Sequence, residues 1–252
     1  MTISVITVTF YSGKTVRDTI ESVLQQSWHE VDYIIVDGAS TDDTLSIAKE
    51  YVPKSDGRMR IVSEPDKGIY DAMNKGLQMA SGDVVGFLNS DDYFTSDDVL
   101  ERVAETFQDE NVDAVYGDVH YVSPNDTTKR MRYYSSRFFS RPLMRFGFMP
   151  AHPSFYCKRS IYAEYGGFDI SYRIAADFEN LLRLIYVNRI RTCYINKDFV
   201  TMRAGGISNA NFANRWQIMR DHVRALRENG VYSNYLFLGL RYFYKLYELI
   251  RR

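Results

Sequence analysis

Two adjacent aspartates, Asp91 and Asp92, directly follow the run VVGFLNS. Carboxylates this close repel each other, and each is costly to move out of water. A divalent cation relieves both costs, because Mg²⁺ and Mn²⁺ take carboxylate oxygens as ligands and in turn hold phosphates. The alternative is a solvated turn that leads into the next helix. The spacing of the two residues alone does not decide between these interpretations.

Acidic residues also follow two other runs that have the composition of buried strands. Asp37 follows YIIV, and Glu64 and Asp66 follow RIVS. Ligands of an open α/β sheet bind beyond the carboxyl ends of its strands, so we expect these loops to meet at one edge. Lys14 and Lys67 fall in loops of the same edge, where they would neutralise a diphosphate. The sequence lacks GxxxxGK[ST] and GxGxxG, which argues against ordinary nucleotide hydrolases and dehydrogenases.

The elements that must position these residues alternate between strand and helix patterns. Aliphatic and β-branched runs predict strands at 3–8, 32–38, 58–64, 83–89 and 113–122. Apolar spacing predicts helices after a cap at Ser12 or Thr15, and at 41–52, 69–80 and 96–108. Such alternation implies an α/β fold with a mainly parallel sheet covered on both faces.

The second half of the chain has a different character. From about Thr127 the sequence is aromatic, basic and irregular, and no Gly/Ser/Pro-rich linker precedes it. We therefore expect a second lobe built onto the sheet rather than a separate domain. The stretch 234–252 has a helical pattern in which Arg241, Lys245, Glu248 and Arg252 form one stripe.

Composition excludes several classes of protein. The 252 residues carry a formal net charge of −1, so nothing indicates a nucleic-acid partner. Cys157 and Cys193 form neither a metal-type spacing nor a disulfide framework, which favours a reducing compartment. The N-terminus reads as a strand rather than a signal peptide, and no run reaches the ~18 apolar residues that span a bilayer. We expect a cytoplasmic protein.

Four segments resemble, in order, the signatures of the family 2 glycosyltransferases. They are SVITVTFYSGKTVRDTIESVLQQ, IIVDGASTDDT, EPDKGIYDAMNKGLQMASGDVVGFLNSDD and GGFDISYRIAADFENLLRL. PDKGIYDAMNKG with FLNSDD resembles a branch found in bacterial polysaccharide clusters of the O-antigen, capsule and colanic-acid type. The resemblance implies a GT-A fold with a Rossmann-like nucleotide-sugar half at 1–125 and an acceptor and catalytic-base half at 126–210. A helical segment at 211–252 would follow.

The resemblance also implies a role for individual residues. Thr7, Val8 and Thr9 would line the nucleotide pocket, and Asp37 would lie near the uracil or ribose. Asp91 and Asp92 occupy the acidic motif, with Asp91 also on the ribose and diphosphate side, and would hold Mn²⁺ or Mg²⁺. Asp177 takes the place of the catalytic base, with Glu179 as the substitute, although ADFENLLRL also reads as an ordinary helix start. The remaining candidates for substrate binding are Lys67, His152, Arg203 and Ser208.

Some of these candidates have ordinary alternatives, and two positions depart from the family pattern. His152 lies in the acceptor region but precedes a proline and also suits a structural hydrogen bond. Arg203 precedes GGIS, a loop that would close over the donor and that ends at Ser208, but a loop arginine is commonly just solvated. Gly38 replaces a second acid that often contacts the base, and Asn89 opens the acidic motif in place of an acid.

These features predict an inverting, metal-dependent glycosyltransferase. It would move a sugar from a UDP-sugar to a hydroxyl of a polyprenyl-diphosphate-linked saccharide and form a β-glycosidic bond. The basic stripe of the last helix suits the inner leaflet of the membrane, or the helix simply covers the core. The alternatives are a sugar nucleotidyltransferase, which needs a glycine-rich loop after the first strand, and a non-catalytic nucleotide-sugar-binding protein.

Overall fold

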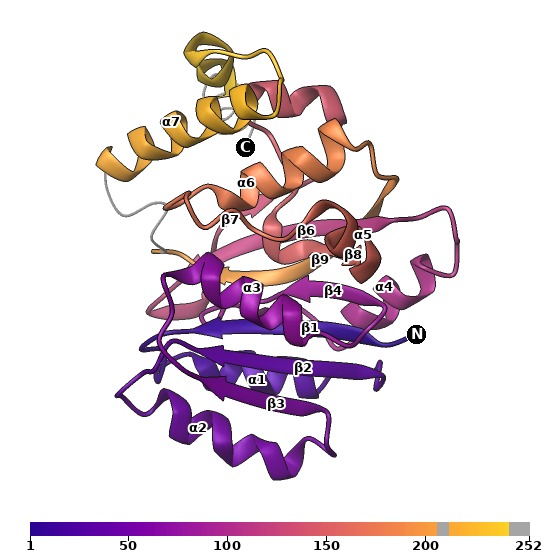
Figure 1. Ribbon diagram of the computed structural model, residues 1–252. Coiled ribbons are helices and arrows are strands. Elements are labelled where there is room, and N and C mark those ends of the chain that lie inside the picture. Colours follow the sequence, from indigo (N-terminus) through magenta and orange to yellow (C-terminus); the bar gives the residue numbers. More distant parts are fainter. Residues whose placement is uncertain (206–211, 242–252) are drawn as a thin grey trace.

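The computed structural model describes residues 1–205 and 212–241, which form a layered α/β structure (Figure 1). Its strands are β1 (Ile3–Thr9), β2 (Val31–Asp37), β3 (Met59–Ser63), β4 (Val84–Phe87), β5 (Tyr93–Phe94), β6 (Ala114–Ser123), β7 (Asp126–Tyr134), β8 (Phe155–Lys158) and β9 (Thr192–Arg203). Its α-helices are α1 (Val16–Leu24), α2 (Thr44–Tyr51), α3 (Ile69–Met79), α4 (Val99–Thr106), α5 (Arg159–Tyr165), α6 (Ala176–Leu181) and α7 (Phe212–Glu228). Short 3₁₀ turns occupy Val52–Lys54, Arg141–Phe146 and His152–Ser154, and α6 continues as a π-helix over Leu182–Val187.

All nine of these strands belong to one sheet, in the order β3-β2-β1-β4-β8-β6-β9-β5 with β7 beside β6. The first four strands are parallel, as their alternation with helices predicts. Beyond β4 the sheet is mixed, because β8 runs antiparallel to both β4 and β6. The predicted fifth strand is β6, which therefore does not pair with the parallel block directly. The α/β architecture is confirmed, and the second lobe contributes strands to the same sheet.

Each face of the sheet carries its own hydrophobic core. Successive side chains of a strand point to opposite faces, so Ile3 and Val5 of β1 face one core while Ile6 and Val8 face the other. The first core packs against α1, α2 and α4, and the second against α3, α5, α6 and α7. Figure 1 shows α3 and α6 on the same side of the sheet. The carboxyl ends of the strands are left uncovered between these two layers.

Two glycines in the quoted signatures have clear structural reasons. Gly68 caps the start of α3 with φ 119°, a backbone conformation that residues with a side chain rarely adopt. Gly86 lies in β4, where a Cβ atom would come within 2.1 Å of the ring of Tyr156 in β8. The tyrosine ring packs directly on the strand backbone, so a larger residue at position 86 would separate β4 from β8.

The C-terminal stripe differs from its expected role at the one position that the structure describes. Residues 235–241 are helical, but Arg241 is only 8% exposed. Its guanidinium donates to the Gly147 carbonyl oxygen at 3.3 Å and lies 3.0 Å from Nδ1 of His222. Arg241 therefore contacts the protein interior instead of a membrane, and Lys245, Glu248 and Arg252 lie outside the described residues. Within 1–205 and 212–241 no helix is both long and apolar enough to cross a bilayer.

Candidate active site

A cavity of about 1190 Å³ opens at the carboxyl edge of the parallel strands, where the sequence predicts a ligand site. It is lined by Thr9 at the end of β1, Gly38 after β2, Asp66 after β3, and the adjacent acids Asp91 and Asp92 after β4. We call it the acid-pair cavity. The loops that follow the four parallel strands thus meet at one site. The loops after β3 and β4 contribute carboxylates to it.

Asp91 and Asp92 lie in the wall of this cavity with little compensation for their charge. Asp92 is 2% exposed, and burial raises its pKa well above the usual range, with the negative charge of Asp91 acting in the same direction. Burial also raises the pKa of Asp91, while the positive charge of Arg203 opposes this shift. The adjacent acids are therefore not an ordinary solvated turn, since water does not screen Asp92.

The neighbours of Asp92 explain how the pair is held in place. Asn89 donates from its side-chain amide to Oδ2 of Asp92 at 3.2 Å, and the backbone N–H of Arg203 donates to Oδ1 at 3.2 Å. The side chain of Arg203 donates to the carbonyl oxygen of Asp91 at 2.6 Å and pairs with Asp18 in α1. Asn89 thus supports Asp92 without adding a third negative charge.

The chemistry of this pair fits a divalent cation. Two carboxylates side by side, one buried and one partly buried, are hard oxygen ligands whose mutual repulsion a cation removes. In the part of the chain that the structure describes, no group of three or more His, Cys, Asp or Glu side chains forms a complete metal cage. Mg²⁺ is commonly held by one or two carboxylates together with substrate phosphates, so two acids are a sufficient protein contribution.

A second cavity of about 640 Å³ adjoins the first and contains Asp177; we call it the Asp177 cavity. The two cavities share lining residues, among them Ile69, Asn89 and Tyr121. Oδ1 of Asp177 accepts the backbone N–H of Phe178 at 2.8 Å and lies 3.5 Å from the hydroxyl of Tyr70. Burial raises the pKa of Asp177 to about 6, against the lowering effect of the Phe178 N–H. A carboxylate with this pKa suits a general base near neutral pH.

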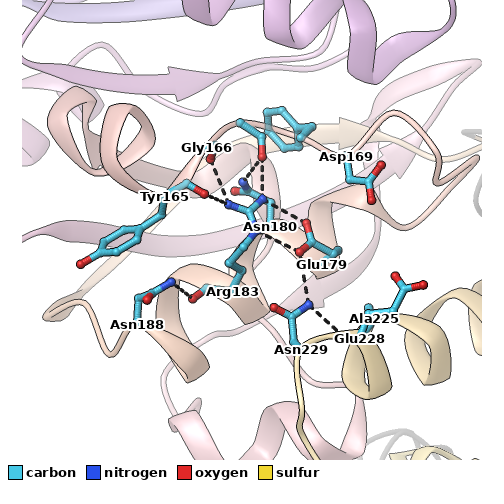
Figure 2. A network of polar contacts seen from close by, with 12 residues as sticks. Tyr165, Gly166, Asp169, Glu179, Asn180, Arg183, Asn188, Ala225, Glu228 and Asn229 are labelled. Carbon is cyan, nitrogen blue, oxygen red and sulfur yellow. Dashed lines mark hydrogen bonds and ion pairs between the residues drawn. The ribbon is translucent and has the colours of Figure 1, made fainter.

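Glu179 is the substitute for Asp177 in the sequence analysis, but its carboxylate is already bound by neighbouring side chains. Figure 2 shows its carboxylate held by Arg183 and Asn229. The Arg183 guanidinium lies 2.9 Å from Oε1 of Glu179, and the Asn229 amide donates to the same oxygen at 3.2 Å. Glu179 is 6% exposed and lines neither cavity, so Asp177 is the better placed of the two acids.

His152 lines the Asp177 cavity and is 6% exposed. Burial lowers its pKa to about 4, so the imidazole is neutral at physiological pH. Its ring packs against those of Phe87 and Phe168, with its centroid 5.4 Å from each, and the two phenylalanine rings also contact each other at 5.1 Å. Nε2 is itself buried and has no hydrogen-bond partner among the described residues.

The structure brings several of the predicted residues to the acid-pair cavity and places others elsewhere. Val8, Thr9, Asp91, Asp92 and Arg203 line it. The alternative for Arg203, a solvated loop residue, is wrong, because its side chain is 9% exposed and paired.

Besides Asp177 and His152, which line the adjoining cavity, three candidates do not line this one. Thr7 is 0% exposed and accepts a hydrogen bond from Tyr33 within the sheet, and Lys67 lines a neighbouring cavity of about 370 Å³. Asp37 is also 0% exposed, because it accepts hydrogen bonds from Ser63 and from the backbone of Ser40 below the surface. Ser208 lies outside the described residues.

The cavity also contains residues that the sequence analysis did not assign. Phe10 and Tyr11 are 60% and 53% exposed, and their rings, 4.3 Å apart, form part of the wall. A Cβ atom on Gly38 would come within 2.5 Å of Oδ2 of Asp66, so the Asp66 carboxylate fills the space that a side chain at position 38 would need. The sequence contains two signals of this arrangement. Position 38 lacks the second acid of the family pattern, and EPDKG contains Asp66, to which the sequence analysis gave no specific role.

Comparison with known proteins identifies the family of this chain. A model of glycosyl transferase family 2 matches residues 4–165, more than half of the chain. A PGL/p-HBAD biosynthesis glycosyltransferase of Mycobacterium bovis is 31% identical over 192 residues, which cover 75% of this chain and 72% of that protein. An uncharacterized glycosyltransferase of Mycobacterium tuberculosis is 34% identical over 189 residues, which cover 74% of this chain and 70% of that protein.

Solved structures share the fold at low sequence identity. TarS 1-349 of S. aureus in complex with UDP-GlcNAc has a TM-score of 0.72 at 19% identity, and covers 90% of this chain and 66% of that one. The match spans 40% of a longer TarS chain. The mannosyltransferase PcManGT of Pyrobaculum calidifontis in complex with GDP-Man and Mn²⁺ has a TM-score of 0.67 at 19% identity, covering 90% and 63%. The GT-A fold is thereby confirmed, and the chain belongs to glycosyl transferase family 2.

Proposed function

We propose that this protein is an inverting, metal-dependent glycosyltransferase that uses a UDP-sugar. It transfers the sugar to a hydroxyl of a lipid-linked saccharide and forms a β-glycosidic bond, in the synthesis of a bacterial surface polysaccharide. The observation that carries the proposal is the pair of adjoining cavities, one with two adjacent acids and the other with a single carboxylate of raised pKa. A transferase needs one site for a charged leaving group and another for the attacking hydroxyl.

The acid-pair cavity is the proposed donor site. Its exposed aromatic rings, Phe10 and Tyr11, offer a surface on which a base stacks, and Asp66 offers a carboxylate in contact with the same wall. Uracil presents an N3–H donor, which a carboxylate accepts well. Lys14 and Arg173 line the same cavity and carry charges that suit a diphosphate. The solved complexes of TarS with UDP and with UDP-GlcNAc support a uridine nucleotide as the donor.

The chemical step is a single displacement. The acceptor hydroxyl oxygen forms a bond to the anomeric carbon while the bond from that carbon to the diphosphate oxygen breaks, and the hydroxyl proton passes to the Asp177 carboxylate. Attack opposite the leaving group inverts the anomeric centre, so an α-linked donor gives a β-glycoside. The raised pKa of Asp177 suits this proton transfer, because a base is most effective when its pKa lies near the working pH.

Asp91 and Asp92 would hold Mn²⁺ or Mg²⁺, which supplies positive charge to the departing diphosphate. Arg203 supports this arrangement by fixing the Asp91 carbonyl and the Asp92 carboxylate. His152 would contact the acceptor from the wall of the Asp177 cavity. The binding of Mn²⁺ by the structurally similar PcManGT supports the choice of metal.

The division into a nucleotide-sugar half (1–125), an acceptor half (126–210) and a helical segment (211–252) belongs to the same proposal. A location in the cytoplasm, at the inner face of the membrane, is also part of this proposal. The sequence of 242–252 still favours that membrane contact, but Arg241 does not contribute to it. Polysaccharide synthesis is the expected setting because of the resemblance of PDKGIYDAMNKG and FLNSDD to that branch.

Incubation with a panel of UDP-, GDP- and dTDP-sugars in the presence of Mn²⁺ tests the function. We expect slow release of UDP from one or more UDP-sugars, since water replaces the missing acceptor. A sugar nucleotidyltransferase would instead release pyrophosphate from a nucleoside triphosphate and a sugar phosphate. A non-catalytic binding protein would bind a nucleotide sugar and release nothing, and either result would contradict the proposal.

A further inference from the structure

A third cavity, of about 340 Å³, continues from the Asp177 cavity toward the second lobe. Its wall is mostly aromatic and aliphatic, with Phe138, Phe139, Phe146, Phe148 and Leu240 among the lining residues. We call it the aromatic groove. Its volume falls within the range of roughly 300–1000 Å³ that is typical of small-molecule sites. None of the described residues that line it is acidic.

The groove and the Asp177 cavity are continuous along one side. Arg132, Tyr134, Gly147, Met149 and Arg241 line both of them. A single ligand can therefore extend from the groove to the neighbourhood of Asp177. Among the described residues, Asp177 is the only carboxylate that lines either cavity, so the path between them favours an anionic group.

Arg132 lies at the junction and supplies that positive charge. Its guanidinium carbon is 5.9 Å from the ring centroid of Tyr121 and 5.7 Å from that of Tyr134. The two rings hold the side chain in place, and no carboxylate of the described residues forms an ion pair with it. A guanidinium that is oriented by aromatic rings and has free N–H donors is suited to a phosphate.

The outer end of the groove remains open to an apolar chain. Phe138 is 75% exposed and Leu240 is 50% exposed, although both line the groove. Arg137 lies over the Phe138 ring at 5.8 Å, which adds positive charge at the rim. The apolar groove, Arg132 and Asp177 follow one another in space. An amphiphile with a hydrocarbon chain and a phosphate at one end matches this arrangement, with its chain in the groove and its phosphate at the arginine.

We propose that the aromatic groove binds the hydrocarbon chain of a lipid-phosphate acceptor and that Arg132 binds its phosphate, with the saccharide in the Asp177 cavity. This assignment rests on the proposed function, because it takes Asp177 to mark the site of the acceptor hydroxyl. It goes further in naming the acceptor as one molecule with a bound lipid chain. Burial of the chain contributes to affinity in proportion to the apolar surface removed from water.

The test measures binding of farnesyl phosphate, farnesol and inorganic phosphate to the full chain by calorimetry. We expect farnesyl phosphate to bind more tightly than farnesol, and inorganic phosphate to bind at least about tenfold more weakly than farnesyl phosphate, since it lacks the apolar part. Arg132→Gln is expected to weaken farnesyl phosphate about tenfold and farnesol hardly at all, while Arg132→Lys recovers part of the loss. Phe138→Ser is expected to weaken both prenyl ligands.

Arg130→Gln is the matched control, because Arg130 lies on the same strand and lines neither cavity. The proposal fails if farnesyl phosphate does not bind the full chain, or if it binds Arg132→Gln as tightly as wild type. UDP-sugar turnover is measured on the same samples. Normal turnover without farnesyl phosphate binding rejects the groove alone, whereas absent turnover rejects the proposed function.

Discussion

At the scale of single residues, the burial of Asp177 sets the pH range of the proposed reaction. Its pKa is raised to about 6, and only the deprotonated carboxylate accepts a proton. We therefore expect kcat/KM to rise with pH, reach half of its plateau near pH 6, and fall to about a tenth of the plateau at pH 5, because kcat/KM reports the pKa of the enzyme without bound substrate. Rates are measured at saturating Mn²⁺ with donor and acceptor well below their KM. A profile that is flat from pH 5 to 8 would contradict the role of Asp177.

The same burial carries a cost in stability. The folded-state pKa of Asp177 lies above its unfolded value of 3.8, so its effect on stability is favourable below pH 3.8 and is lost as pH rises through 6. At pH 7.5 the Asp177→Asn variant should unfold at a temperature equal to or above that of wild type, with a gain on the order of 1–3 kcal/mol. Thermal unfolding by circular dichroism checks this, and a markedly lower melting temperature would show that the carboxylate stabilises the fold.

Asp66 is expected to determine which base is bound. Asp66→Asn should weaken UDP binding about tenfold and reduce the preference for UDP over CDP, because an amide can also donate to N3 of cytosine. Glu64→Gln is the matched control: Glu64 lies on the same loop, pairs with Lys75 at 2.8 Å, and does not line the cavity. Calorimetric titration with both nucleotides measures the ratio. An unchanged ratio in Asp66→Asn would assign base recognition to another group.

The site was partly predictable from the sequence at this scale. Asp91, Asp92 and Asp177 could be placed because strand ends and family signatures point to them. The burial of Asp37 could not be predicted, since it depends on its contact with Ser63 across two strands. The position of Asp66 depends on how the EPDKG loop folds over Gly38, and a linear sequence does not specify that contact.

At the scale of elements, the ion pair of Arg183 with Glu179 joins three segments of the chain. Arg183, in the π-helix, donates to the backbone carbonyls of Gly166 and Gly167 at 3.1 and 2.6 Å and to the carbonyl of Tyr165 (Figure 2). It also pairs with Glu179 in α6, which in turn accepts the Asn229 amide after α7. Since α6 carries Asp177, this network supports the position of the proposed base.

Removing this arginine should destabilise the protein strongly. Arg183→Met leaves the buried carboxylate of Glu179 without its counter-charge, at a cost of about 3–5 kcal/mol. Arg220→Met is the control, because Arg220 is an exposed arginine on α7. Urea unfolding gives both values. If the two variants lose similar stability, below about 1 kcal/mol, the network does not hold these segments together.

The order of elements was largely predictable, and the pairing of the later strands was not. Periodicity places β1 to β4 and α1 to α4 within a few residues of their observed bounds. The strand β8 inserts between β4 and β6 because Tyr156 packs on Gly86, a contact between positions 70 residues apart that no local pattern encodes. The buried position of Arg241 likewise depends on Gly147 and His222, which lie far away in the sequence.

At the scale of the whole molecule, one sheet carries both halves of the proposed reaction. The carboxyl ends of β1 to β4 form the acid-pair cavity, and α6 places Asp177 in the adjoining one. Met202 of β9 and Tyr121 of β6 line both cavities, and Arg203 at the end of β9 contacts Asp91, Asp92 and Asp18 beside the first of them. The account therefore assigns donor binding and proton transfer to separate residues of a continuous site.

Parallel measurements of UDP binding and UDP-sugar turnover in two variants test this assignment most directly. We expect Asp177→Asn to bind UDP with Mn²⁺ as wild type does and to lose turnover by at least about a hundredfold. Asp92→Asn should lose the increase in UDP affinity that Mn²⁺ produces, and with it turnover. If Asp177→Asn keeps full turnover, or if Mn²⁺ affects UDP binding equally in wild type and Asp92→Asn, the account is wrong.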